Sequence, residues 1–168
     1  MTPSIRPAAH EDFGAIQAIY AHHVLTSTAT FETEAPTIEE MHRRWSELTS
    51  RHFPYLVAAC DGQIAGYAYV SPYRPRPAYR FTVEDSIYLH PAFQGKGIGK
   101  RLLGAVIEAV VRQHYRQMIA VIGGSSNVAS IRLHESLGFE LTGTLIRVGY
   151  KFDQWIDTVL MQRNLTNR

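Results

Sequence analysis

QGKGIGKRLLGAVIEAVV, residues 94–111, places three glycines directly before an amphipathic segment with helical spacing. Gly95, Gly97 and Gly99 let the backbone turn without a Cβ clash, and the free N–H groups of a helix N-terminus attract anions. The stretch therefore predicts a site for a phosphorylated cofactor, although a plain strand-to-helix turn would give the same pattern. The apolar face of the helix is expected at Leu102, Leu103, Val106, Ile107, Val110 and Val111.

Two common nucleotide-binding motifs do not fit this loop. A P-loop needs Ser or Thr after Gly-Lys, but Gly97 follows Lys96. A Rossmann fingerprint needs the spacing G-x-G-x-x-G in the first β-α unit, whereas this loop lies in the middle of the chain, after strands that are expected to be antiparallel.

The composition is that of an ordinary globular protein. At 168 residues the chain is expected to form a single domain, residues 1–168. Its formal net charge is +2 with no basic stripe, so nucleic acid is not an expected partner. The single cysteine, Cys60, excludes an internal disulfide framework, and Glu108 interrupts the best candidate for a membrane span. These features predict a cytoplasmic protein without a membrane partner.

The order of elements predicts an α/β fold with one mixed, mostly antiparallel sheet flanked by helices. Asp61-Gly62 suits a tight turn between two antiparallel strands, and Thr37 and Glu40 have the spacing of a helix capping box. Three prolines between Ser71 and Arg80 are expected to exclude regular structure there. Strands are expected at 4–8, 55–60, 63–70, 80–91, 118–124, 142–152 and 157–164, and helices at 11–23, 37–51, after the glycine loop and at 127–137.

The motifs along the whole chain resemble those of the GNAT superfamily of N-acetyltransferases. Gln94, Gly97 and Gly99 match the Q-x-x-G-x-G/A motif that binds the pyrophosphate of coenzyme A in that family. Asn127 and Ser130 match the opening of its next helix, which here also holds Leu133 and ends in Gly138 and Phe139. The resemblance implies the GNAT fold, with splayed central strands, and acetyl-CoA as co-substrate without a metal.

One departure from the family motif indicates a branch. In the family motif L-Y-x-x-x-G-F, the position of the Tyr is occupied here by His134. With AVIGG before it, SIRLHESLGF around it and GYKFDQWIDT after it, the chain is similar to phosphinothricin acetyltransferases and to relatives that acetylate methionine sulfoximine and methionine sulfone. That branch implies acetylation of the α-amino group of a small amino-acid analogue.

The resemblance also implies which residues bind the coenzyme. The strand that carries Ile87, Tyr88 and Leu89 offers backbone amides to the pantetheine arm, and the amide of Leu89 is expected to bind the thioester oxygen as a catalytic group. The expected coenzyme-binding residues are Ile87, Tyr88, Leu89, Gln94, Gly95, Lys96, Gly97, Ile98, Gly99, Lys100, Asn127 and Ser130.

Two side chains are candidates for proton transfer. Strand alternation places Glu84 on one face with Ser86 and Tyr88, and places Asp85 on the other. The resemblance implies that Glu84 is the general base for the amine; the alternative is a solvent-facing glutamate on an edge strand. Helical spacing places His134 on one face with Asn127 and Ser130, where it is either the acid for the leaving thiolate or a partner in the base role.

The proline-rich loop is the candidate acceptor site. The loop holds Arg74 and Arg76, and arginine side chains bind carboxylates and phosphinates through paired N–H donors. The resemblance adds Phe31 as an apolar wall. Tyr79 lies between these arginines and Glu84, which completes the expected substrate-binding set. The alternative for the arginines is a solvated basic loop.

Other functions stay open at this stage. The acceptor could instead be a protein N-terminus, a lysine or a polyamine, and a non-catalytic coenzyme A sensor would share the glycine loop. A zinc site at His22-His23 is rejected because adjacent helical residues diverge and no further ligands have metal spacing. The resembled enzymes form homodimers, and residues 149–158 are a plausible part of such a contact.

Overall fold

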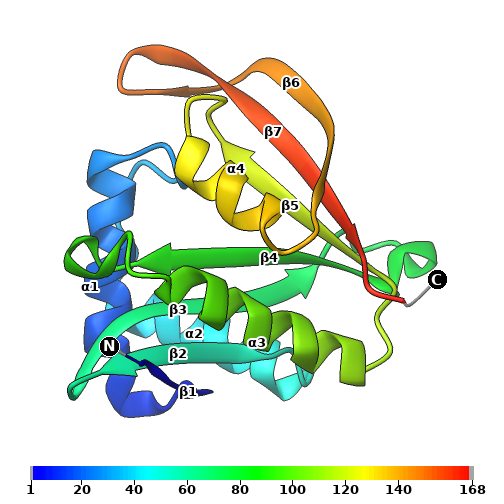
Figure 1. Cartoon of the computed structure of the whole chain (residues 1–168). Helices are drawn as coiled ribbons and strands as arrows, with labels where there is room; N and C mark the ends of the chain where they lie inside the picture. Colours follow the sequence, from blue (N-terminus) through cyan, green and yellow to red (C-terminus); the bar gives the residue numbers. More distant parts are fainter. Residues whose placement is uncertain (1, 167–168) are drawn as a thin grey trace.

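The computed structural model describes residues 2–166, which form one seven-stranded sheet (Figure 1). The strand order is β1-β2-β3-β4-β5-β7-β6, in which β4 and β5 are parallel and the other neighbours are antiparallel. This confirms the expected mixed, mostly antiparallel α/β fold. The strands are β1 (Ser4–Pro7), β2 (Tyr55–Cys60), β3 (Gln63–Pro72), β4 (Thr82–Leu89), β5 (Gln117–Gly123), β6 (Glu140–Lys151) and β7 (Gln154–Asn164).

Helices cover both faces of the sheet, with α3 on one face and α1 and α2 on the other (Figure 1). Their bounds are α1 (Phe13–Thr26), α2 (Ile38–Ser50), α3 (Ile98–Arg112) and α4 (Val128–Glu135). The Thr37 side chain caps α2 by accepting a hydrogen bond from the Glu40 amide, as the spacing predicts. The first expected helix, 11–23, is shifted: a 3-10 turn at His10–Asp12 precedes α1.

The proline-rich segment corrects a second expectation, because part of it is regular. Strand β3 runs through Ser71 to Pro72, and Pro77–Tyr79 forms a 3-10 turn. The missing N–H of Pro72 lies on the β2 side of β3, beyond Tyr55, the first residue of β2, so no ladder hydrogen bond is lost. Pro77 takes the first position of its turn, where an N–H would have no partner in any case.

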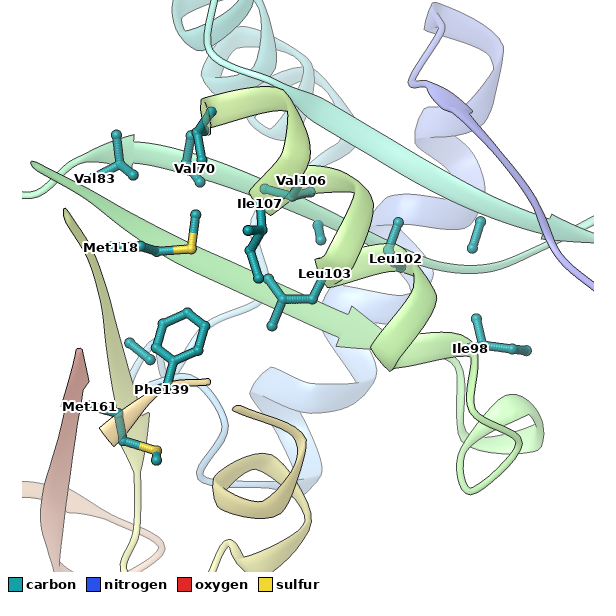
Figure 2. Close-up of a cluster of buried hydrophobic side chains, with 14 of the residues drawn as sticks. Val70, Val83, Ile98, Leu102, Leu103, Val106, Ile107, Met118, Phe139 and Met161 are labelled. Carbon is teal, nitrogen blue, oxygen red and sulfur yellow. The ribbon is translucent and has the colours of Figure 1, made fainter. Parts of the chain in front are cut away.

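The larger core packs α3 against the sheet (Figure 2). Leu102, Leu103 and Val106 are fully buried against side chains that include Val70 and Met118. The expected apolar face of the helix is therefore confirmed with one exception. Val111 is 42% exposed, because it points about 100° away from buried Val110 on the helix.

The two central strands part halfway along their length. The pairing of β4 with β5 is limited to residues Thr82–Asp85 of β4 and Gln117–Ala120 of β5. Beyond these residues β4 remains paired with β3, and β5 remains paired with β7. Figure 1 shows the two strands diverging from their common origin. The expected splay is present, and it opens the sheet at the second half of β4.

Candidate functional site

A cleft of about 910 Å³ fills the gap between the parted strands. Its walls are the second half of β4, the end of β5, the segment after α1, the glycine loop and α4. Since the gap lies within the sheet itself, side chains from both faces of the sheet line the cleft.

The backbone of β4 contributes hydrogen-bonding groups to the cleft. The β3–β4 register makes Tyr88 a hydrogen-bonded partner of Tyr67, so the amides of Ile87 and Leu89 point the opposite way, toward the gap. The carbonyl of Leu89 on that same edge accepts a hydrogen bond from His23 Nε2 at 2.8 Å. Ile87, Tyr88 and Leu89 all line the cleft, where the sequence places them.

The glycine loop enters the cleft at the N-terminus of α3. Gly95 and Gly97 have φ of +73° and +76°, a region that side chains disfavour, and a Cβ at either would meet no atom within 4 Å. Gly97 is the N-cap of α3 and offers no side-chain cap, so the first helical N–H groups are open to a ligand. Gly99 is needed for packing, since a Cβ there would lie 3.2 Å from the Leu89 side chain.

The structure divides the predicted loop residues into two groups. Gln94, Gly95, Gly97 and Gly99 line the cleft. Lys96, Ile98 and Lys100 do not: Ile98 is buried in the core, whereas Lys96 and Lys100 are exposed beside the loop. Asn127 and Ser130 also line the cleft, and the Asn127 side chain caps α4 by accepting from the Ser130 amide at 3.3 Å.

Glu84 lies on the face of the sheet that α1 and α2 cover, at the point where the strands part. Burial, reinforced by the negative charge of Asp85, raises the pKa of Glu84 to about 6, although Arg74 acts in the opposite direction. Since β4 is a central strand, the alternative of a solvated glutamate on an edge strand is wrong.

His134 lies on the opposite face and is 2% exposed. Its Nδ1 is 2.7 Å from the Ser130 carbonyl oxygen and its Nε2 is 3.0 Å from Asp85 Oδ2. Burial alone would lower the pKa of His134, but the hydrogen bond and charge of Asp85, together with the Ser130 carbonyl, raise it overall. The sequence places Asp85 on this face but gives no sign of its pairing with His134.

Of the expected acceptor residues, Phe31 lines the cleft, and Arg74, Arg76 and Tyr79 lie outside its lining. Arg74 stacks on the Tyr73 ring at 5.2 Å, and that ring meets Tyr79 edge-on. The charge of Arg74 is nevertheless close enough to act on Glu84.

A buried lysine that the sequence does not reveal fixes the segment next to Phe31. Lys151 Nζ donates hydrogen bonds to the carbonyl oxygens of Ser27 and Thr30, both at 2.8 Å. Phe31 itself packs over Gly149, where a side chain would collide with its ring. The end of the cleft that Phe31 lines is thus held by β6.

Two kinds of feature are absent from residues 2–166. No group of three or more His, Cys, Asp or Glu side chains is arranged to hold a metal ion in this range. No helix in the same range is long and apolar enough to cross a membrane.

Comparisons with known proteins agree with this geometry. The family model described as "Acetyltransferase (GNAT) domain" matches residues 5–160. A phosphinothricin N-acetyltransferase of Alcaligenes faecalis is 49% identical over 96% of this chain and 82% of its own length. An L-methionine sulfoximine/L-methionine sulfone acetyltransferase of Salmonella typhimurium is 41% identical over 96% of this chain and 94% of its own.

A solved structure extends the similarity to three dimensions. The phosphinothricin acetyltransferase of Sinorhizobium meliloti, crystallised in complex with AcCoA, superimposes with a TM-score of 0.94. It is 47% identical and the match covers 98% of this chain and 89% of that one. The parted strands, the glycine loop before α3 and these matches lead to one conclusion: the chain belongs to the GNAT family of acetyltransferases.

Proposed function

We propose that this chain transfers the acetyl group of acetyl-CoA to the α-amino group of a small amino-acid analogue of the phosphinothricin, methionine sulfoximine and methionine sulfone type. The observation that carries the proposal is the cleft through the sheet, which joins an uncapped helix N-terminus suited to bind an anion to the half-buried side chain of Glu84. The names of the similar proteins from Alcaligenes faecalis and Salmonella typhimurium support this acceptor class. We take residues 1–168 as one acetyltransferase domain.

The glycine loop fits the pyrophosphate of the coenzyme. Gly95 and Gly97 leave open space where side chains would project, next to the uncapped N–H groups of α3. Along the arm, the amides of Ile87 and Leu89 face the gap, and the Leu89 amide is suited to bind the thioester oxygen. When bound, acetyl-CoA supplies the activated acetyl group, and Asn127 and Ser130 line its path.

Glu84 is suited to remove the proton from the substrate ammonium group. A base works best when its pKa lies near the working pH, and the buried carboxylate approaches that condition. His134 lies across the sheet with both ring nitrogens engaged, so we assign it the acid role and not a share of the base role. A coenzyme A sensor would need neither group.

The acceptor end combines an apolar wall with nearby positive charge. Phe31 forms the wall, and Arg74 and Arg76 lie in the loop between β3 and β4, so they are placed to bind an anionic group at the rim. Tyr79 supports that loop through Tyr73. We propose that the carboxylate or phosphinate of the acceptor binds there while its amine points to Glu84.

The assembly is proposed to be a homodimer in the cytoplasm. β6 is an edge strand of the sheet, and its large apolar side chains are exposed together with one from β7. Such a patch is typical of a protein–protein contact. The exposed residues are Leu145, Ile146, Val148, Tyr150 and Trp155. The buried free thiol of Cys60 is consistent with a reducing compartment.

Gly97→Val should abolish the rise in melting temperature that acetyl-CoA causes, since a β-branched residue strains φ of +76° and fills the space for the pyrophosphate. Thermal shift with and without acetyl-CoA measures this. Gly62→Val is the matched control, because it imposes the same strain at φ +79° in the β2–β3 turn. Normal binding by the Gly97 variant would rule out the pyrophosphate site.

Glu84→Gln should lower kcat by roughly a hundredfold or more while acetyl-CoA affinity stays constant, because only the base is lost. In the wild type, kcat/KM should fall as the pH drops below about 6, where Glu84 becomes protonated. Initial rates of thiol release at several pH values give both results. A variant as fast as the parent across the pH range would remove Glu84 from the mechanism.

Arg74→Ala or Arg76→Ala should raise KM for methionine sulfone by roughly tenfold or more and leave acetyl-CoA affinity unchanged. The control is the same acceptor with its carboxylate amidated: the wild type should use it poorly, and the arginine variants should lose little more. Equal activity on acid and amide would show that the arginines only solvate the loop, and would favour a polyamine or protein acceptor.

Trp155→Asp should shift the chain from dimer to monomer, because it places a charge within the apolar patch on β6 and β7. Sedimentation equilibrium measures the mass in solution. Ile38→Asp is the control, as Ile38 is also exposed but lies at the start of α2. A monomeric wild type would contradict the proposal directly.

A further inference from the structure

Two consecutive carboxylates, Glu84 and Asp85, stand on opposite faces of β4 at its last pair with β5. Asp85 is 7% exposed and lines the cleft, and its Oδ2 lies 3.0 Å from His134 Nε2. Its other oxygen, Oδ1, is buried without a hydrogen-bond partner among residues 2–166. A buried carboxylate that retains an unpaired oxygen is costly, which points to a functional reason for it.

The hydrogen-bond partners of the two His134 ring nitrogens indicate how many protons the ring carries. The Ser130 carbonyl oxygen can only accept, so Nδ1 at 2.7 Å must carry a proton. Asp85 Oδ2, when the carboxyl is ionised, also accepts, so Nε2 then carries the second proton. With Asp85 ionised, the ring is an imidazolium ion paired with a carboxylate in a buried site.

We propose that Asp85 is a positioning residue for acetyl transfer: it holds His134 as a cation on the α4 side of the sheet, which makes His134 the acid, and its charge keeps the base role at Glu84. This inference rests on the proposed function and deepens it. Neither the glycine loop nor the arginine loop is involved.

Both proton-transfer candidates, Glu84 and His134, lie close to charged or polar groups from neighbouring elements. Glu84 is faced by Asp85 from its own strand and by Arg74 from the preceding loop, and the first of these favours its protonated form. His134 is faced by Asp85 from β4 and by the Ser130 carbonyl from α4. From α1, His23 lines the same cleft, and burial lowers its pKa, so it adds no positive charge near neutral pH.

The proton balance of the step follows from these roles. The amine nitrogen, after losing one proton to Glu84, forms its bond to the thioester carbon, and the carbon–sulfur bond breaks with its electron pair on sulfur. His134 gives one proton to that sulfur, and the hydrogen bond that this N–H made to Asp85 or to the Ser130 carbonyl breaks. The nitrogen loses its second proton through Glu84 after Glu84 has released the first to solvent. His134 regains a proton from solvent, so each turnover releases one proton in total.

The pH profile of Asp85→Asn tests the proposal. In the wild type, kcat/KM should fall at acidic pH as Glu84 is protonated and at alkaline pH as His134 loses its proton. Removing the Asp85 charge lowers the pKa of both groups, so both limbs should move toward acid, the alkaline one by about one pH unit or more. Asp61→Asn, the same change in the exposed β2–β3 turn, should leave both limbs in place. A profile that is only scaled down would mean a merely structural role.

Nitrogen NMR of the histidine side chains supplies a readout that needs no turnover. At pH 7 the His134 ring of the wild type should carry protons on both nitrogens, and in Asp85→Asn it should titrate at lower pH. A neutral His134 ring in the wild type would overturn the proposal, even if no Asp85 variant folds. A wild type that transfers no acetyl group to any amine would instead refute the proposed function, and the spectra would still decide the charge of the pair.

Discussion

The parting of β4 from β5 is the constraint on which the site depends. Backbone N–H and C=O groups in a sheet must find partners, and the pairing that ends at Asp85 and Ala120 leaves the following groups of both strands facing a gap. Leaving these backbone groups unpaired would cost free energy, and hydrogen bonds within the chain satisfy some of them. His23 donates to the Leu89 carbonyl, and the Thr28 hydroxyl donates to the Gly123 carbonyl. The amides left over, including that of Leu89, are the groups that a ligand can use.

The far end of the gap is closed by the segment after α1, and β6 holds that segment in place. Lys151 reaches two of its carbonyl oxygens from a buried position, where the ammonium group acts as a local cap for the end of α1. Gly123 and Gly149 have no side chain because Thr28 and Phe31 occupy the space. Contacts that are about 120 residues apart in sequence therefore define the shape of the acceptor end.

What could be predicted from the sequence was set by local physics. The glycine loop and the apolar face of α3 follow from backbone sterics and helical spacing, and the antiparallel pair β2–β3 follows from its turn residues. The expectation failed at Val111 because periodicity cannot say which of two adjacent valines takes the core. It failed at Pro72 because only the register shows that this residue lies beyond Tyr55, where β2 begins. The pairing of Asp85 with His134 joins residues 49 apart, and strand alternation alone gives only the face.

Because Glu84 and Asp85 are consecutive residues of one strand, their carboxylates lie on opposite faces of the sheet and do not share one pocket. Two negative charges in one pocket repel, and the usual outcome is that one of them is protonated. Alternation puts the Asp85 carboxylate across the sheet, 3.0 Å from the His134 ring that is proposed to neutralise it, while its negative charge still raises the pKa of Glu84. In bulk water, with a dielectric constant near 80, this repulsion would be weak, at about 1 kcal/mol for charges 4 Å apart. Burial is what makes it strong enough to matter. The gap between β4 and β5 opens between the two faces, so in the proposed mechanism the strand that separates the acid, His134, from the base, Glu84, also presents both of them to one substrate.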